Sequence, residues 1–249
     1  MPRANRHFLP HHVWHITHRC HRQEFLLKFA KDRQRWRYWL YQARKRFGLC
    51  VLNYIVTSNH IHLLVRDHGE GEIAESMQLI AGRVAQEYNR RKGRKGAFWE
   101  DRYHATAADS EVYLARCMVY VDLNMVRAGV VSHPDDWTVC GYREIQHPPQ
   151  CYAVIDRLAL CNLLGIQHDA GLREQHAGWI ETALANGEYA HETCWTQSLA
   201  VGGREFLEAV RATLGSRGRY RDIEEQHGML ALREPATAYK ADFGVEPPL

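Results

Sequence analysis

The order of apolar and polar positions predicts four short strands in the first 110 residues. Apolar and polar residues alternate in 13–20 (VWHITHRC), as in a half-buried strand, and β-prone runs follow at 50–58 and 60–66. Because only Asn59 separates these two runs, we expect them to pair as an antiparallel hairpin. A fourth strand-like stretch ends near Ala107.

Three helices alternate with these strands. Apolar residues recur at three- and four-residue steps in 28–47 and in 72–92, which predicts two amphipathic helices. A third helix is predicted to start with a cap at Asp109 or Ser110 and to end at Gly129, which tolerates the left-handed conformation of a helix end. The order strand, helix, strand, strand, helix, strand, helix predicts an α+β fold, in which one antiparallel sheet has helices packed on a face.

Composition changes near residue 150 and divides the chain. Residues 151–249 carry 9 basic and 14 acidic residues, with predicted helices near 170–186 and 203–214 and an irregular tail from 233 onward. We therefore predict a domain over residues 1–150 and a mainly helical extension over 151–249, whose role the sequence does not disclose.

Charge is concentrated near the N-terminus. The first 50 residues hold 12 Lys and Arg against 2 acids, although the whole chain has a net charge of only +3. This excess fits a surface that binds a polyanion such as nucleic acid, and it fits equally a solvated helix face. The seven cysteines are scattered singly, which favours reduced thiols over a zinc knuckle or disulfide framework. With no apolar run near the roughly 20 residues that span a bilayer, a cytoplasmic protein without membrane contact is expected.

Two histidines provide the first candidate chemistry. His60 and His62 are two positions apart on a predicted strand, so both imidazoles project from the same face and could share one ion. In a chain with 16 histidines, such a pair is also compatible with two surface histidines.

The third predicted helix strengthens this interpretation, because it carries a single polar stripe. At 100° per residue, five polar side chains lie within about 40° of one line, while the other faces are largely apolar. A helix that is apolar over most of its surface is buried, so the stripe should line a cleft. Asp122 lies on the opposite side and is unexplained by this pattern. The stripe consists of Tyr113, Arg116, Tyr120, Asn124 and Arg127.

Tyr120 and Asn124 are stacked one helical turn apart. The Asn124 amide oxygen could complete a three-ligand set with the two imidazoles for Mg²⁺ or Mn²⁺. Tyr120 would then lie beside an ion that polarises a phosphate, and its phenol could attack to form a phosphotyrosine. A core tyrosine and an amide that bonds the helix end fit the spacing equally well.

Three segments resemble a known family. SNHIHLLV (58–65), GAFWEDRYH (96–104) and YVDLNMVRAGVV (120–131) are similar, in order and spacing, to the REP-associated tyrosine transposases, which are single-tyrosine members of the HUH endonuclease superfamily. The resemblance spans roughly residues 8–145. It implies an HUH fold, which is a ferredoxin-like or RRM-like sandwich, and places the catalytic domain in residues 1–150.

The resemblance also implies roles for individual residues. His60 and His62 correspond to the HUH metal ligands, Tyr120 to the nucleophile and Asn124 to the additional ligand. Met125 stands where the family usually has proline, a change that should alter the helix end and leave the chemistry intact. Such proteins cut single-stranded DNA near imperfect hairpins, retain a 5′-phosphotyrosine and release a 3′-hydroxyl.

A hairpin substrate agrees with the basic residues. The loop after the second helix could track DNA backbones, while nearby aromatic residues stack on unpaired bases. On the tyrosine stripe, Arg116 and Arg127 could bind the scissile or a flanking phosphate, or could pair with acids. Trp36 and Trp39 are expected in the core. The basic loop residues are Arg90, Arg91, Lys92, Arg94 and Lys95.

Two other functions remain compatible with the sequence. One is a catalytically silent protein that binds DNA hairpins, and the other is an HUH replication initiator or relaxase. The intact set of His60, His62 and Tyr120 favours an enzyme over the first, and a short chain without a helicase region disfavours the second. Either a monomer or a homodimer is compatible with the sequence.

Overall fold

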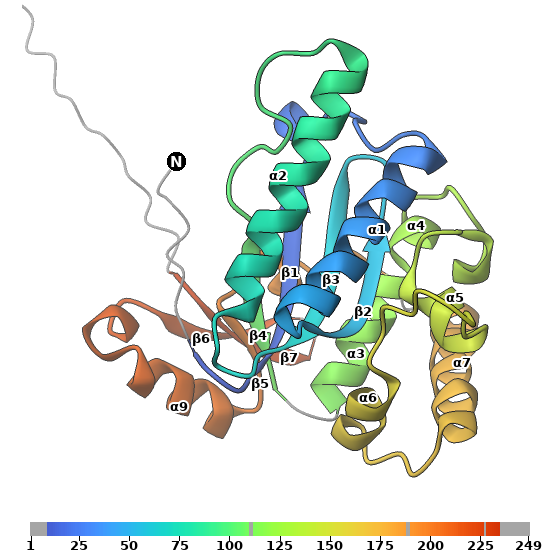
Figure 1. The fold of residues 1–249 in the computed structure, drawn as a ribbon. Helices are drawn as coiled ribbons and strands as arrows, with labels where there is room; N and C mark the ends of the chain where they lie inside the picture. Colours follow the sequence, from blue (N-terminus) through green and yellow to red (C-terminus); the bar gives the residue numbers. More distant parts are fainter. Residues whose placement is uncertain (1–8, 110–111, 188–189, 227, 235–249) are drawn as a thin grey trace, which may run out of the picture.

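The computed structural model describes residues 9–109, 112–187, 190–226 and 228–234. Its framework is a seven-stranded sheet with the order β2-β3-β1-β4-β5-β7-β6 (Figure 1). Among the described strands, β4 and β5 pair in parallel and every other neighbouring pair is antiparallel. The strands are β1 (Val13–Arg19), β2 (Cys50–Val56), β3 (His60–Arg66), β4 (His104–Ala108), β5 (Ala200–Gly202), β6 (Asp222–Gln226) and β7 (Met229–Arg233).

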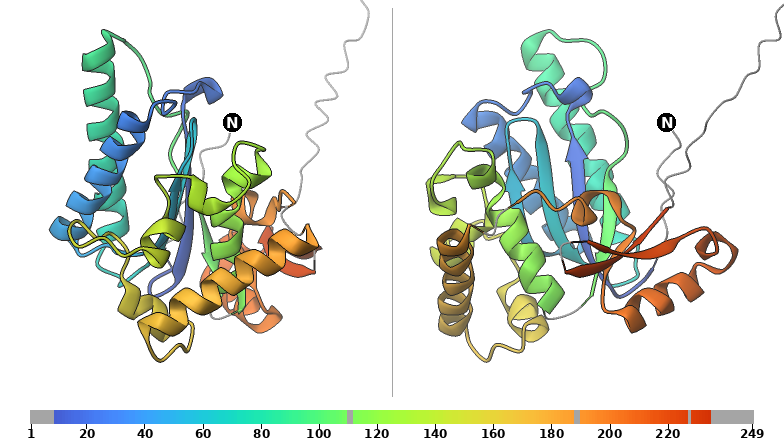
Figure 2. Two further views of the ribbon diagram at one scale, coloured as in Figure 1. Left: turned by 90° about the vertical axis from the view of Figure 1, so that its right-hand side faces the viewer. Right: turned by 180° about the vertical axis from the view of Figure 1, so that it is seen from behind.

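Helices cover both faces of this sheet, whereas the sequence predicted helices on one face. Figure 2 shows α1 and α2 on one side of the sheet and α3 and α7 on the other. The α+β class is confirmed. The helices are α1 (Ala30–Phe47), α2 (Glu72–Lys92), α3 (Val112–Asp122), α4 (Asn124–Arg127), α5 (Gly141–Gln146), α6 (Arg157–Leu163), α7 (Asp169–Asn186), α8 (Cys194–Gln197) and α9 (Arg204–Thr213).

The predicted strands and the first two helices are confirmed to within a few residues. β2 and β3 form the expected antiparallel hairpin around Asn59. Helix α1 is anchored in the core by Trp36, which is 1% exposed, while Trp39 is partly buried against the core. Both α1 and α2 end at glycines with positive φ, where a side chain would be strained.

The third predicted helix is divided in two. Helix α3 ends at Asp122, Leu123 leaves the helical region with ψ near 6°, and α4 resumes at Asn124. The predicted end is confirmed, because Gly129 has φ 66°. At the start of the helix, Ser110 lies outside the described residues, and the Asp109 carboxylate accepts a hydrogen bond from the Gly203 backbone N–H.

The segment beyond residue 150 continues the same sheet. Strand β5 pairs with β4 through Ala107 and Ala200, and β7 and β6 extend the sheet from β5. Helices α6 and α7 pack on the face that carries α3 (Figure 1). The predicted helices at 170–186 and 203–214 are α7 and α9, whereas most of the tail predicted from 233 lies outside the described residues.

Candidate active site

Strand β3 presents the two histidines on the sheet face that α3 covers. His60 lies opposite Arg19 and His62 lies opposite Thr17 in the pairing with β1. Because side chains alternate along a strand, the intervening Ile61 points to the other face, where α1 and α2 form the core. The imidazole centroids of His60 and His62 are 5.0 Å apart. The prediction that both rings share one face is confirmed.

Helices α3 and α4 bring Tyr120 and Asn124 to this pair. The side-chain amide nitrogen of Asn124 lies 3.0 Å from His62 Nε2, and the Tyr120 ring centroid lies 5.7 Å from that of His62. A half-turn of the Asn124 amide exchanges its nitrogen and oxygen, so the oxygen can occupy the same position. Two imidazoles, one amide and one phenol therefore converge in a small volume.

Hydrogen bonds fix which nitrogen of His60 faces the site. Its Nδ1 lies 2.7 Å from Asn59 Oδ1 and 3.1 Å from Thr57 Oγ1. Since the Asn59 oxygen can only accept, the bond to it requires a proton on Nδ1. The lone pair of the neutral ring is then on Nε2, which can coordinate a metal.

A longer chain of hydrogen bonds fixes His62 in the same way. The Trp195 carbonyl oxygen lies 2.8 Å from His15 Nδ1, and His15 Nε2 lies 2.9 Å from His62 Nδ1. The carbonyl can only accept, so His15 carries its proton on Nδ1 and accepts through Nε2. His62 must then donate from Nδ1, which leaves its Nε2 lone pair directed at Asn124.

Electrostatics keep both imidazoles neutral. Burial, with a contribution from Arg19, lowers the pKa of His60 to about 4, and burial with the neighbouring His60 lowers the pKa of His62 well below its ordinary value. Neutral imidazoles are the form that binds metal ions. Among the described residues, no three His, Cys, Asp or Glu side chains form a metal site, so a third protein ligand would be the amide of Asn124.

Tyr120 is protonated at neutral pH in this environment. It is 4% exposed, and burial raises the pKa of its phenol to about 12, although the nearby Arg127 favours the phenolate. The Arg127 guanidinium stacks 4.3 Å from the centroid of the Tyr120 ring and donates to the Tyr120 carbonyl oxygen at 3.0 Å. Of the two arginines predicted on the stripe, Arg127 thus contacts Tyr120 directly, through its ring and its carbonyl oxygen.

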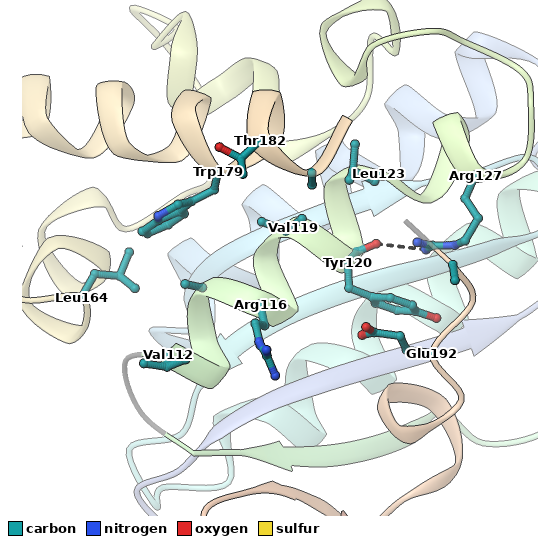
Figure 3. Close-up of a pocket in the computed structure, with 13 residues that line it drawn as sticks. Val112, Arg116, Val119, Tyr120, Leu123, Arg127, Leu164, Trp179, Thr182 and Glu192 are labelled. Atoms are coloured by element: carbon teal, nitrogen blue, oxygen red, sulfur yellow. Dashed lines mark hydrogen bonds between the residues drawn. The ribbon is translucent and has the colours of Figure 1, made fainter. Parts of the chain in front are cut away.

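Sequence reasoning missed the groups that surround Tyr120 from the C-terminal segment. Trp195 and His191 lie within 6.5 Å of the Tyr120 ring by centroid distance, and Glu192 lies beside it in Figure 3. No pattern in their own segment indicates this contact. His15 could have been found from the sequence. It lies two positions from Thr17 on a predicted strand, so both side chains share one face, and Thr17 is the residue paired with His62.

The structure accounts for Asp122, which the polar stripe did not explain. Its carboxylate accepts a hydrogen bond from the Asn53 side-chain amide at 3.0 Å and contacts His176 Nε2 at 2.7 Å. All three side chains are fully buried. They connect β2, α3 and α7, so the C-terminal segment holds the tyrosine-bearing helix against the sheet.

The basic residues predicted as a loop lie away from this cluster, and Arg90, Arg91 and Lys92 belong to the last turn of α2 rather than to the loop that follows it. Arg91 forms an ion pair with Asp32, and Arg94 donates to the Ala97 carbonyl oxygen at 2.7 Å. Arg90, Lys92 and Lys95 are exposed. The loop nevertheless lies at the His60 end of the sheet, because backbone bonds at 98–100 join it to the end of β1.

Comparison with known proteins identifies the class. Residues 9–124, a little under half of the chain, match the family model described as "Transposase IS200 like". The matched segment is therefore similar to the transposases, a class of enzymes that act on DNA. The matched segment contains His60, His62, Tyr120 and Asn124, and it ends before α7 and α8.

The fold is shared with a solved REP-associated tyrosine transposase bound to a REP hairpin. That structure is 18% identical, with a TM-score of 0.50, and the match covers 63% of this chain and 94% of the other. A protein of Deinococcus radiodurans R1 that has been assigned as a transposase matches at 15% identity and a TM-score of 0.35, over 47% of this chain and 93% of its own. Curated protein sequences give no significant match. Among the described helices, none has the length and hydropathy needed to cross a bilayer.

Proposed function

We propose that this protein is a transposase, a metal-dependent endonuclease and strand transferase that cuts single-stranded DNA near hairpins through a covalent phosphotyrosine. The observation that carries the proposal is the convergence of His60, His62, Asn124 and Tyr120. Asn124 contacts His62 at 3.0 Å, and the Tyr120 ring lies 5.7 Å from the same imidazole. A nucleophile beside a potential metal site is the arrangement that phosphoryl transfer requires.

The proposed metal ligands are His60 Nε2, His62 Nε2 and the amide oxygen of Asn124. Two neutral nitrogens and one oxygen leave room for water and phosphate oxygens on Mg²⁺ or Mn²⁺. When bound, such an ion polarises the scissile phosphate and offsets its negative charge. His60 donates from Nδ1 to the Asn59 side-chain oxygen and His62 donates from Nδ1 to His15 Nε2, and these bonds hold the two rings in the required tautomers.

Tyr120 is the proposed nucleophile. Its phenol oxygen forms a bond to phosphorus as the bond from phosphorus to the 3′ oxygen breaks. The phenol loses its proton in this step, and the leaving 3′ oxygen takes a proton to become a hydroxyl. The guanidinium of Arg127, stacked on the phenol ring, favours the charged form of the nucleophile. The product retains a 5′-phosphotyrosine.

The proposed substrate is a DNA hairpin with unpaired flanks. Support comes from the solved relative, which is bound to a REP hairpin. The basic end of α2 and the loop after it lie at the His60 end of the sheet, where Arg19 is paired opposite His60. We assign backbone contacts to this end, because cationic side chains there can follow DNA that enters the site. The assigned residues are Arg90, Arg91, Lys92, Arg94 and Lys95.

Replacement of the nucleophile tests the proposal. Tyr120→Phe removes one oxygen and preserves the ring, so it should retain hairpin binding and form no covalent adduct with single-stranded DNA in Mg²⁺ or Mn²⁺. Hairpins from repeats flanking the gene are the substrates, and the adduct is detected by denaturing electrophoresis. Tyr113→Phe, on the same helix, is the control and should behave as the wild type. An adduct formed by Tyr120→Phe at the wild-type rate would exclude Tyr120 as the nucleophile.

A further inference from the structure

A pocket of about 810 Å³ opens between the tyrosine-bearing helix α3 and helix α7 of the C-terminal segment. Figure 3 shows Arg116, Val119 and Tyr120 along one wall, with Trp179 and Thr182 on the opposite helix. The volume lies within the range of sites that enclose small organic ligands, which is about 300–1,000 Å³. The pocket therefore has room for a group the size of a nucleobase.

The two ends of the pocket differ in chemistry. One end is apolar and is formed by Trp179, Leu164 and Val119. The side near Tyr120 carries the guanidiniums of Arg116 and Arg127 and the carboxylate of Glu192 (Figure 3). A nucleobase has the matching distribution, with apolar faces that stack on aromatic rings and a polar edge that offers hydrogen-bond donors and acceptors.

Arg116 indicates a ligand at the polar end. Its side chain is exposed and lines the pocket, and it forms no hydrogen bond or ion pair with any residue that the structure describes. Arg127, in contrast, is stacked on Tyr120 and bonded to its carbonyl oxygen. An unpartnered guanidinium beside the nucleophile is suited to a base edge or to the phosphate attached to that base.

We propose that this pocket binds one unpaired base of the DNA strand next to the phosphate that Tyr120 attacks. The inference rests on the proposed function and names the part of the substrate that α7 contacts. Tyr120 borders both the pocket and His62, so a strand whose phosphate lies at the histidines has a neighbouring base within reach of the pocket. Trp179 stacks on the base, and Glu192 and Arg116 contact its edge.

This assignment gives the C-terminal segment a role in substrate choice. Trp179 and Glu192 lie beyond residues 9–124, the segment that matches the transposase family. The groups proposed for chemistry come from the family segment, whereas half of the base pocket comes from outside it. Binding of one base in this pocket would fix which phosphate lies beside Tyr120, and so the position of cleavage relative to the hairpin.

The test is a binding cycle between protein variants and abasic DNA. Hairpins with unpaired flanks, taken from repeats flanking the gene, receive a single abasic site at each unpaired position in turn. Dissociation constants are measured by fluorescence anisotropy in chelator, so that no cleavage occurs. For the wild type, one abasic position should weaken binding about 5- to 150-fold, the range that loss of one stacked base produces. In Trp179→Ala, the abasic and the unmodified hairpin should bind with the same dissociation constant. Trp179→Phe, which keeps a flat ring, should retain most of the wild-type ratio between the two constants.

A second variant guards against misfolding of Trp179→Ala. Thr182 is exposed on α7 and lines the pocket, so Thr182→Trp should occupy the pocket without disturbing the core. It should also remove the abasic difference. If neither variant changes the difference at any position, the pocket does not bind a base.

Failure of this inference is distinguishable from failure of the proposed function. Adduct formation by the wild-type protein on the unmodified hairpin reports the chemistry alone. If an adduct forms but the loss of affinity caused by the abasic site is the same with and without Trp179, the base pocket is excluded and the nuclease assignment stands. A difference that depends on Trp179 without any adduct would support the pocket and overturn the nuclease.

Discussion

The segment from residue 9 to 124 and the segment beyond 150 contribute to the same site in different ways. The first supplies the groups proposed for chemistry, namely His60, His62, Tyr120 and Asn124. The second supplies groups that hold or surround them, including the Trp195 carbonyl at 2.8 Å from His15 and His176 at 2.7 Å from Asp122. The family match covers the first and none of the second. The groups proposed for chemistry thus lie in the segment that the family model matches, while the Trp195 carbonyl and His176 lie outside it.

The largest effect should come from the metal ligands of the family segment. His60→Ala removes one of two proposed imidazole ligands, and cleavage of a single-stranded hairpin should fall by about 100-fold or more, beyond the 10- to 100-fold typical of residues behind a ligand. Chelation should have the same effect, and salt-dependent binding should persist in both cases. The measurement is the initial rate of cleavage of labelled DNA.

His68→Ala is the matched control, because His68 lies just beyond the same hairpin and is exposed. It should cleave at the wild-type rate. Cleavage that persists in chelator would exclude a role for a metal ion, and only the assignment of Tyr120 as the nucleophile would remain.

The next effect concerns the buried support from α7. His176→Ala leaves the Asp122 carboxylate buried and bonded to the Asn53 amide, and loss of one member of a buried pair costs about 3–5 kcal/mol of unfolding free energy. Urea denaturation measures the change. His147→Ala, at an exposed histidine, should change the stability little. A loss below about 1 kcal/mol, the size of a surface pair, would show that α7 does not hold α3 through this contact.

A smaller effect should separate metal binding from DNA binding. His15→Ala interrupts the chain of hydrogen bonds that fixes His62, and it should weaken Mn²⁺ binding about 10- to 100-fold, as for other residues behind a metal ligand. Calorimetric titration of DNA-free protein measures the affinity. His15→Gln, whose amide both donates and accepts, should retain more affinity than His15→Ala.

His18→Ala is the control for this prediction, since His18 lies on the same strand but faces the other side of the sheet. Hairpin binding in chelator should be unchanged in all three variants. Equal Mn²⁺ affinity in wild type and His15→Ala would remove His15 from its supporting role.

The smallest effect is a pH dependence of the unfolding free energy, which arises where β4 contacts the C-terminal segment. His104, on β4, contacts the Ser198 carbonyl oxygen at 3.0 Å, and burial lowers its pKa from the ordinary value of 6.5. Just below pH 6.5 the unfolded state therefore binds more protons than the folded state. The contribution of neutral, buried His104 to the unfolding free energy is complete above pH 6.5 and is lost as the pH falls. His104→Gln should make the unfolding free energy less sensitive to acid than in the wild type, and an unchanged pH profile would contradict the assignment.

The sequence alone determined what depends on local periodicity. Alternation in β3 placed His60 and His62 on one face, and the helical repeat placed Tyr120 one turn from Asn124, because strand and helix geometry fix these relations within a few residues. The strands, the first two helices and the α+β class followed from the same patterns.

Only the tertiary structure decided which distant segments meet. The bond between His15 and the Trp195 carbonyl joins residues 180 positions apart, and the contact between Asp122 and His176 joins residues 54 apart. Such contacts depend on how helices and strands pack, and no repeat within either segment encodes them. The helices on both faces of the sheet and the pocket beside Tyr120 have the same origin, since each results from packing among separate elements.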